Sequence, residues 1–358
     1  MYERIELVGD IMAYTTVNKP TDYFNTVIYT GNGTTDNAIT GVGFQPDLNW
    51  IKERSNAESH IVHHVGMSSG DYLRPDSIAG LSNSGEMTKS LDTDGFTLGT
   101  RGEVNQSSTD YVAWNWLADN TTGSSDTNGS ITSTVSANTT SGFSIVKYTG
   151  TGANATVGHG LSTAPKFIMT KNLADESGYG WYCYHASRGA TKSLYFHTTD
   201  AEVTGTDRWN DTAPTSTVFS VGTNGGTNAS STNMIAYCFS EVQGFSRIGQ
   251  YTGNGNADGP FVYTGFKPAF VIGKKANSTE DWFMFDSTRD PYNPVHRLIY
   301  HRNAAEYTGV NPRHDFLSNG FKVKTTDGKE NTSGAPYIFI AFAAEPLVGS
   351  NNVCATAR

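Results

Sequence analysis

Three stretches of the chain open with the same pattern of aromatic, β-branched and small residues, and they decide the fold. They read Phe24-Asn-Thr-Val-Ile-Tyr-Thr-Gly31, Phe143-Ser-Ile-Val-Lys-Tyr-Thr-Gly150 and Phe245-Ser-Arg-Ile-Gly-Gln-Tyr-Thr-Gly253. Their tyrosines lie 119 and 103 residues apart, and a proline and a lysine farther along keep the same two separations. The matched positions are Tyr29, Tyr148 and Tyr251; Pro46, Pro165 and Pro268; Lys52, Lys171 and Lys274. The chain therefore holds three copies of one unit.

The later part of each copy repeats as well. Each copy closes with an apolar segment in which an alanine is followed by an aromatic residue, and small and large side chains alternate along it. A period of two places successive side chains on opposite faces of a strand. The first copy departs in its middle, where His60 and Met67 stand in place of a tryptophan and an arginine. The matched positions are Phe96, Phe219 and Phe321; Ala113, Ala236 and Ala341; Trp114, Tyr237 and Phe342; Trp181 and Trp282; Arg188 and Arg289.

Short strands at regular spacing, turns rich in Gly, Asn, Ser and Thr, and the lack of a helical apolar period predict an all-β chain. We expect three tandem antiparallel β-sandwich or jelly-roll-like domains built from the repeat, because a unit of roughly 100 residues can bury its own core. The expected parts are an N-terminal arm (1–20), copy 1 (21–118), a polar linker (119–142), copy 2 (143–242), copy 3 (243–346) and a C-terminal tail (347–358). The centre of the linker, Ser130–Val135, could add an edge strand.

The composition excludes several classes of function. Charged residues make up 16% of the 358 residues and the net charge is −9, whereas a nucleic-acid-binding surface needs clustered Lys and Arg. Aromatic residues at 12% indicate a packed core, since disordered chains are poor in them. No apolar stretch approaches 18 residues and the N-terminus resembles no secretory signal, so we expect no membrane insertion. Three cysteines without metal-ligand spacing are expected to be free thiols: Cys183, Cys238 and Cys354.

No pattern of catalytic residues emerges, so we expect neither an enzyme nor a cofactor. The chain has no Gly-x-Ser-x-Gly motif and no recurring pair of carboxylates of the kind that glycoside hydrolysis requires. The glycine-rich stretch at 253–259 lacks the lysine of a phosphate loop, and its counterparts identify it as a turn of the repeat. His60, His63 and His64 offer a metal two ligands at most, with no acidic residue nearby, and a metal site is not expected.

Aromatic side chains are the remaining candidates for binding. A tryptophan ring flanked by amide donors suits a sugar ring, and Trp209 lies in the polar sequence Asp-Arg-Trp-Asn-Asp. We therefore expect an exposed Trp209, with Arg208 and Asn210 beside it, as the candidate carbohydrate-binding site. Tryptophans at strand positions favour a core role instead, and the recurring arginines favour a structural one. These residues are Trp50, Trp181 and Trp282, and Arg188 and Arg289.

The repeated motifs YTGNG, GFKPAFV, DGFTLG and YVAWNW resemble repeat-bearing virion proteins of tailed bacteriophages, especially marine ones. The resemblance runs from about Ala13 to near the end, where Ala-Thr-Ala-Arg358 closes the chain. Because such proteins begin at a motif similar to Met12-Ala-Tyr-Thr-Thr16, residues 1–11 are expected to be either an extension or the product of an upstream start. Members are described as tail, fibre or lectin-like structural proteins, and the resemblance implies no catalytic residues.

The resemblance implies a virion structural protein that is exposed on the particle, is associated with the tail or a fibre, and takes part in adsorption to the host surface. It would assemble in the bacterial cytoplasm, with other virion proteins as partners, a host-surface glycan as a possible ligand, and copies of itself as neighbours. Two alternatives stay open: a capsid decoration or cement protein, and a soluble carbohydrate-binding, lectin-like module.

Overall fold

The computed structural model describes residues 14–174, 178–348 and 354–356, to which every structural statement below refers. Within them the chain forms 27 strands, four α-helices of four residues each, and one 3-10 turn, η1 (Pro20–Asp22). All paired strands are antiparallel. The all-β class predicted from the repeat is therefore confirmed.

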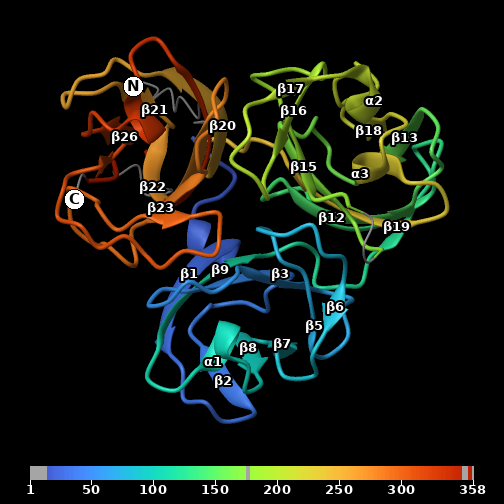
Figure 1. Cartoon of the computed structure of the whole chain (residues 1–358), viewed down its shortest axis with the longest axis horizontal. Helices are drawn as coiled ribbons and strands as arrows, with labels where there is room; N and C mark the ends of the chain where they lie inside the picture. Colours follow the sequence, from blue (N-terminus) through green and yellow to red (C-terminus); the bar gives the residue numbers. More distant parts are fainter. Residues whose placement is uncertain (1–13, 175–177, 349–353, 357–358) are drawn as a thin grey trace, which may run out of the picture.

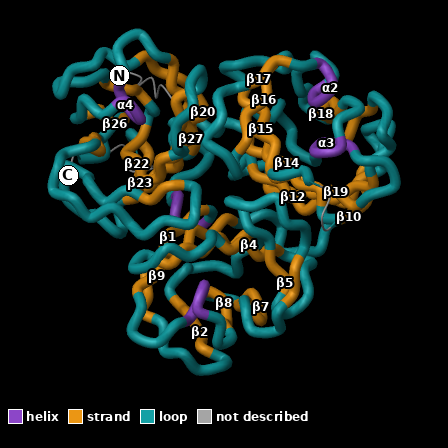
Figure 2. Tube along the Cα trace, in the orientation of Figure 1, coloured by secondary structure: helices purple, strands orange, loops and turns teal. Residues whose placement is uncertain are grey.

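Copy 1 forms one large sheet, one small sheet and a short strand pair (Figures 1 and 2). The sheets have the orders β1-β9-β3-β4 and β2-β8-β7, and β5 pairs with β6. The elements are β1 (Phe24–Thr30), β2 (Asn37–Thr40), β3 (Leu48–Glu53), β4 (Ile61–His64), β5 (Asp71–Tyr72), β6 (Ser82–Asn83), β7 (Thr88–Asp92), β8 (Gly95–Leu98), α1 (Gly102–Asn105) and β9 (Asp110–Trp116).

Copy 2 repeats this arrangement and extends it at both edges. Its large sheet has the order β10-β11-β12-β19-β14-β15-β16-β17, and β13 pairs with β18. The elements are β10 (Ser124–Asp126), β11 (Ser133–Asn138), β12 (Phe143–Thr149), β13 (Ala155–Gly158), β14 (Phe167–Asn172), β15 (Trp181–His185), β16 (Lys192–Tyr195), β17 (Val203–Thr204), α2 (Thr206–Trp209), β18 (Val218–Val221), α3 (Gly225–Asn228) and β19 (Asn233–Phe239).

Copy 3 has a large sheet of order β20-β27-β22-β23-β24 and a small sheet of order β21-β26-β25. The elements are β20 (Ser246–Thr252), β21 (Phe261–Tyr263), β22 (Phe266–Lys275), β23 (Phe283–Asp286), β24 (Ile299–Tyr300), β25 (His314–Leu317), β26 (Gly320–Val323), α4 (Gly328–Asn331) and β27 (Pro336–Pro346). The central four strands of all three large sheets thus follow one order, as the repeat requires.

The segment expected to be a polar linker contributes strands to copy 2, at the place where Ser130–Val135 was expected to add one. The segment 119–142 contains β10 and β11, and β11 pairs along its whole length with β12. Its residues alternate between buried and exposed from Ile131 to Val135, so the Ser and Thr side chains occupy the solvent face of a strand whose other face is covered. The segment is therefore part of the copy 2 sheet rather than a linker, and β11 lies between β10 and β12 rather than at the edge.

Each copy has an apolar cluster of its own between its large and small sheets, and all three copies share a larger one. The three lobes surround a common centre, into which each large sheet presents its second face (Figure 1). In the closing strands Ala113, Ala236 and Ala341 belong to the separate clusters, whereas the aromatic residues that follow them belong to the shared cluster. The alternation of small and aromatic residues is therefore an alternation between two cores.

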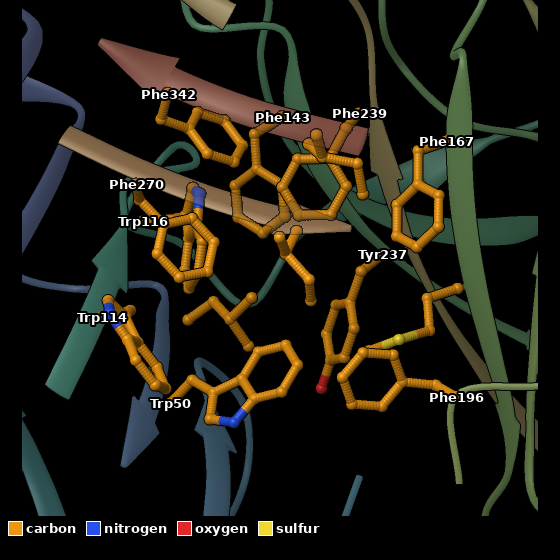
Figure 3. Packing of buried hydrophobic residues seen from close by; sticks show 14 of the residues in the cluster. Trp50, Trp114, Trp116, Phe143, Phe167, Phe196, Tyr237, Phe239, Phe270 and Phe342 are labelled. Atoms are coloured by element: carbon orange, nitrogen blue, oxygen red, sulfur yellow. The ribbon is translucent and has the colours of Figure 1, made fainter. Parts of the chain in front are cut away.

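The shared cluster is dominated by aromatic side chains from all three copies (Figure 3). Phe24 stacks on Phe342 with ring centroids 5.0 Å apart, which joins copy 1 to copy 3. Trp116 lies edge-on to Phe239 at 6.2 Å, which joins copy 1 to copy 2. At the centre an apolar cavity of about 30 Å³ remains, lined by residues of all three copies. Because both faces of each large sheet are covered, the three copies are packed as one body.

Candidate functional site: the Trp209 loop and the contacts between copies

Trp209 is not exposed, which corrects the candidate glycan site. It ends the short helix α2, its side chain is 1% exposed, and it belongs to the apolar cluster of copy 2. Its ring lies edge-on to Tyr184 with centroids 5.9 Å apart. The polar neighbours in the sequence misled the prediction, because a single helical turn directs the indole inward while the flanking side chains face outward or bind one another. A buried ring cannot stack on a sugar.

The other two predicted residues also hold the loop together. The Arg208 guanidinium donates to the Asp207 carboxylate at 2.8 Å and to the Tyr195 hydroxyl at 3.0 Å. Asn210 adopts the left-handed conformation, with φ of 49°, at the C-terminal end of α2. Asn224 donates to the second oxygen of Asp207 at 2.8 Å. The three residues expected to form a binding site are thus neighbours, but they form a structural cap over the copy 2 core.

The tryptophans expected in the core are buried, and their indole nitrogens also connect the copies. Trp181 of copy 2 donates from Nε1 to the carbonyl oxygen of Arg74 in copy 1 at 2.8 Å. Trp282 of copy 3 donates to the carbonyl oxygen of Tyr195 in copy 2 at 2.9 Å. Both contacts use corresponding donors and corresponding acceptors, so the two boundaries are built alike.

His60 makes the third contact of this kind. It occupies the tryptophan position in copy 1, and its Nε2 lies 2.8 Å from the carbonyl oxygen of Tyr300 in copy 3. Trp50 donates from Nε1 to the His60 Nδ1 at 2.9 Å, so Nδ1 accepts and the Nε2 carries the proton that it donates to Tyr300. Burial holds the pKa of His60 well below its usual value. The substitution in copy 1 therefore keeps the contact, and the three copies form a closed ring.

A second set of contacts repeats around the ring through the backbone. Leu81 of copy 1 donates to Leu173 of copy 2 at 3.0 Å, and Glu202 of copy 2 donates to Ala276 of copy 3 at 2.8 Å. Glu306 of copy 3 closes the series by donating to the carbonyl oxygen of Arg54 in copy 1 at 2.8 Å. Each acceptor lies two residues after a matched lysine of the repeat. The three boundaries therefore share one geometry, although copies 1 and 3 are the most distant in sequence.

The matched lysines are buried and bind carbonyl groups. Lys171 reaches from copy 2 to the Ile78 carbonyl oxygen of copy 1 at 2.8 Å, and Lys274 reaches from copy 3 to the Thr199 carbonyl oxygen of copy 2 at 3.0 Å. Lys52 donates to the carbonyl oxygen of Glu53. Burial lowers the pKa of Lys52 and of Lys274 to about 8. Lys171 and Lys274 thus serve the boundaries between copies, whereas Lys52 binds within copy 1.

The recurring arginines form ion pairs with acidic residues that the sequence analysis did not single out. Arg188 binds both oxygens of Glu202 at 2.6 Å. Arg289, fully buried, donates to Asp286 at 2.5 Å and to Glu306 at 2.7 Å. Burial alone would raise the pKa of Glu306, but Arg289 and Arg54 outweigh it and hold that pKa below its usual value.

A signal for these acidic partners was present in the sequence. Glu202 and Glu306 occupy corresponding positions, as their backbone contacts show, and copy 1 has Leu81 at that position. Copy 1 also has Met67 where the others have the arginine. The arginine and its acidic partner are therefore both replaced in copy 1. A search for positions at which only copy 1 lacks the shared residue would have identified the partner.

The histidines of β4 do not gather around a common point. The ring of His63 contacts the carbonyl oxygen of Asp71, and the ring of His64 contacts that of Val65. Among the described residues no three His, Cys, Asp or Glu side chains are placed to hold a metal ion. In the same part of the chain no helix has the length and apolarity to span a membrane.

Comparison with known proteins places the whole ring in one family. A family model described as Domain of unknown function (DUF7483) matches residues 19–346. The chain belongs to this family. The range that matches DUF7483 spans all three copies, so the family model corresponds to the ring and not to a single copy. No curated protein and no solved structure matched the chain.

Proposed function

We propose that this DUF7483 protein is a structural protein of a tailed-bacteriophage particle, exposed on the particle surface and associated with the tail or a fibre during adsorption to the host. One observation carries the proposal: three diverged copies close into a ring whose boundaries repeat the same hydrogen bond from a buried side chain. Such a body resists deformation, because opening any boundary exposes apolar surface and leaves buried polar groups unpaired. The resemblance of the repeated motifs to virion proteins supports a location on the particle.

Within this proposal each copy is a β-sandwich-like domain. Support comes from the two sheets of each copy, which enclose an apolar cluster of their own. The proposed partners are other virion proteins and neighbouring copies of this chain, in a particle assembled in the bacterial cytoplasm. The burial of Trp209 removes the residue that suggested glycan binding, so the proposal assigns no glycan contact to that loop.

Labelling of intact particles tests the proposal. Antibodies raised against the purified protein, carrying gold, should decorate the tail or its fibres in electron micrographs of purified phage. The same antibodies should slow adsorption to host cells, whereas antibodies depleted on the purified protein should do neither. Label distributed over the capsid would replace this proposal with the decoration-protein alternative. Particles that contain none of the protein by mass spectrometry would refute a virion role.

A further inference from the structure

Copy 3 has an open groove beside its first strand. Strand β20 lies at the edge of its sheet, with only β27 hydrogen-bonded to it among the described strands. A groove of about 340 Å³ runs between β20 and β21, over the ring of Phe339. Two aromatic side chains at this groove are unusually exposed, Phe261 at 46% and Tyr263 at 53%. An open strand edge with apolar side chains beside it is a site where another strand can pair.

The corresponding groove of copy 2 is filled by a strand. There β11 pairs with β12, with Ser133 opposite Tyr148, Val135 opposite Val146 and Ala137 opposite Ser144. Just before β11, Ile131 bridges to Val157 of β13. Ser144 and Val146 are buried as a result, whereas the corresponding residues of copy 3, Arg247 and Gly249, are exposed and half-buried. Copy 3 has only six residues between β19 and β20, too few to form a strand that folds back on β20.

The chain carries a second segment that resembles β11. Leu7-Val-Gly-Asp-Ile-Met-Ala13 matches Ile131-Thr-Ser-Thr-Val-Ser-Ala137 at each position that faces the copy 2 groove: Leu for Ile, Gly for Ser, Ile for Val, and Ala for Ala. Each segment is followed by one residue and then by two threonines, as Tyr14-Thr-Thr16 and Asn138-Thr-Thr140. Residues 1–13 lie outside the described part of the chain.

The first described residues lie at the end of the copy 3 groove. Tyr14 donates from its hydroxyl to the carbonyl oxygen of Gly265 at 2.7 Å, and Thr15 donates to that of Gln243 at 2.5 Å. In copy 2 the glycine that corresponds to Gly265 is Gly160, and there a Cβ would lie 3.0 Å from the Cβ of Ala137. The Tyr14 hydroxyl therefore lies at the glycine that the end of β11 contacts in copy 2, so the chain before Tyr14 is attached close to the open groove.

We propose that the N-terminal segment 7–13 is the strand that binds this groove, antiparallel to β20. The register of copy 2 places Gly9 opposite Tyr251, Ile11 opposite Gly249 and Ala13 opposite Arg247. In the proposed register Ile11 would cover the ring of Phe339, and Leu7 would lie against β21. The inference gives the segment before Tyr14 a role: it supplies to copy 3 the strand that copy 2 takes from its own preceding residues.

Disulfide formation in the full-length protein tests the register. In a Cys354→Ser background, Ala13→Cys is combined either with Arg247→Cys or with Asn25→Cys, the equivalent position on the open edge of copy 1. Under mild oxidation the first pair should form an intramolecular disulfide at least tenfold faster than the second. Faster bonding to position 25, bonding between two chains, or bonding to neither position would each overturn the proposal.

Two charged variants of the arm extend the test. Ile11→Asp places a carboxylate on the side that faces the groove, whereas Val8→Asp places it on the side that faces water. Added to the Ala13→Cys, Arg247→Cys chain, Ile11→Asp should slow disulfide formation at least tenfold, and Val8→Asp should leave the rate within twofold. Equal rates for the two variants would show that the segment does not pair in this orientation. Neither variant alters the folded core, so both chains remain measurable.

Discussion

Trp114 and Asp286 lie 172 positions apart in the chain, and the indole Nε1 of Trp114 donates a 3.0 Å hydrogen bond to the Asp286 carboxylate. Both side chains are fully buried. The same carboxylate oxygen accepts from Arg289, whose guanidinium lies 5.8 Å from the Trp114 ring centroid. This contact joins the last strand of copy 1 to copy 3, at the boundary that closes the ring.

Removing that carboxylate should destabilise the protein strongly. Asp286→Ala leaves the buried Arg289 with one acidic partner fewer and leaves Trp114 without its acceptor, which costs about 3–5 kcal/mol for a broken buried ion pair. Urea unfolding monitored by tryptophan fluorescence measures the loss. Asp258→Ala is the control, since Asp258 binds Lys322 at the surface, and it should leave the unfolding midpoint unchanged. Equal midpoints for the two variants would contradict the importance of this boundary.

Trp209→Ala should unfold early, contrary to what an exposed ring would do. Truncating a fully buried tryptophan costs about 3–5 kcal/mol through lost burial and the cavity that remains. Tyr292→Ala, at a side chain that is 78% exposed, is the control and should melt like the wild type. Thermal unfolding by circular dichroism compares the two. A Trp209→Ala protein that melts normally would mean that the ring lies outside the core after all.

Copy 1 has Met67 and Leu81 where copy 2 has the ion pair of Arg188 and Glu202, and this apolar pair suggests a replacement for it. Arg188→Met alone removes the arginine partner of Glu202, whose side chain is only 9% exposed. The free energy of unfolding should fall by about 1–2 kcal/mol. Adding Glu202→Leu, which reproduces the Met67 and Leu81 combination, should restore part of that loss. A double-mutant cycle in urea measures the coupling between the two positions. Strictly additive effects would show that the pair contributes nothing as a unit.

Acid should destabilise the fold before most carboxylates titrate. Burial lowers the pKa of eight histidines, so the unfolded chain takes up protons near pH 6.5 while the folded chain does not. Stability therefore falls as the pH drops below 6.5, by about 2 kcal/mol for one such histidine between pH 6.5 and 5. The histidines are His60, His63, His64, His159, His185, His197, His301 and His314.

Four buried carboxyls act in the opposite direction over part of this range. Burial raises the pKa of Asp47 and of Asp76 to about 6, that of Glu330 to about 8, and that of Glu53 above its usual value, so all four favour the folded state as the pH falls toward 4. The eight histidines outnumber them, and the net effect should be a lower urea midpoint at pH 5 than at pH 7.5. A midpoint that rises on acidification would contradict the neutral state of the buried histidines.

Thiol reactivity should separate the three cysteines. Cys183 and Cys238 are buried, and burial raises the pKa of both thiols, so neither supplies a reactive thiolate near neutral pH. Cys354 is exposed. A colorimetric thiol reagent should therefore titrate one thiol in the native protein and three in unreduced protein in guanidinium. A count of one after denaturation would reveal a disulfide between the buried pair.

The sequence predicted the positions of the strands better than it predicted what their side chains contact. The spacing from Tyr29 to Lys52, kept in each copy, predicted the repeat, and alternation around Ala113 predicted a closing strand with two different faces. The sequence could not show which core each face contacts, because an aromatic side chain is equally suited to the core of one copy and to a core shared by three copies. Local polarity was misleading at the Trp209 loop, where polar neighbours flank a side chain that points inward. It was misleading in part at 119–142, where a strand was expected only at the centre of a linker.

Closure of the ring also bears on how this protein associates. Each boundary joins two different surfaces: a hydrogen-bond donor side chain of one copy and an acceptor carbonyl of the next. Contacts of this kind extend indefinitely unless the rotation between copies closes them into a ring. Here the ring closes after three copies, and the donor surface of copy 1 meets the acceptor surface of copy 3 within one molecule. A variant that opened only that boundary would carry one free donor surface and one free acceptor surface. Such molecules could join end to end, so the contact of His60 with Tyr300 also protects the protein against polymerisation.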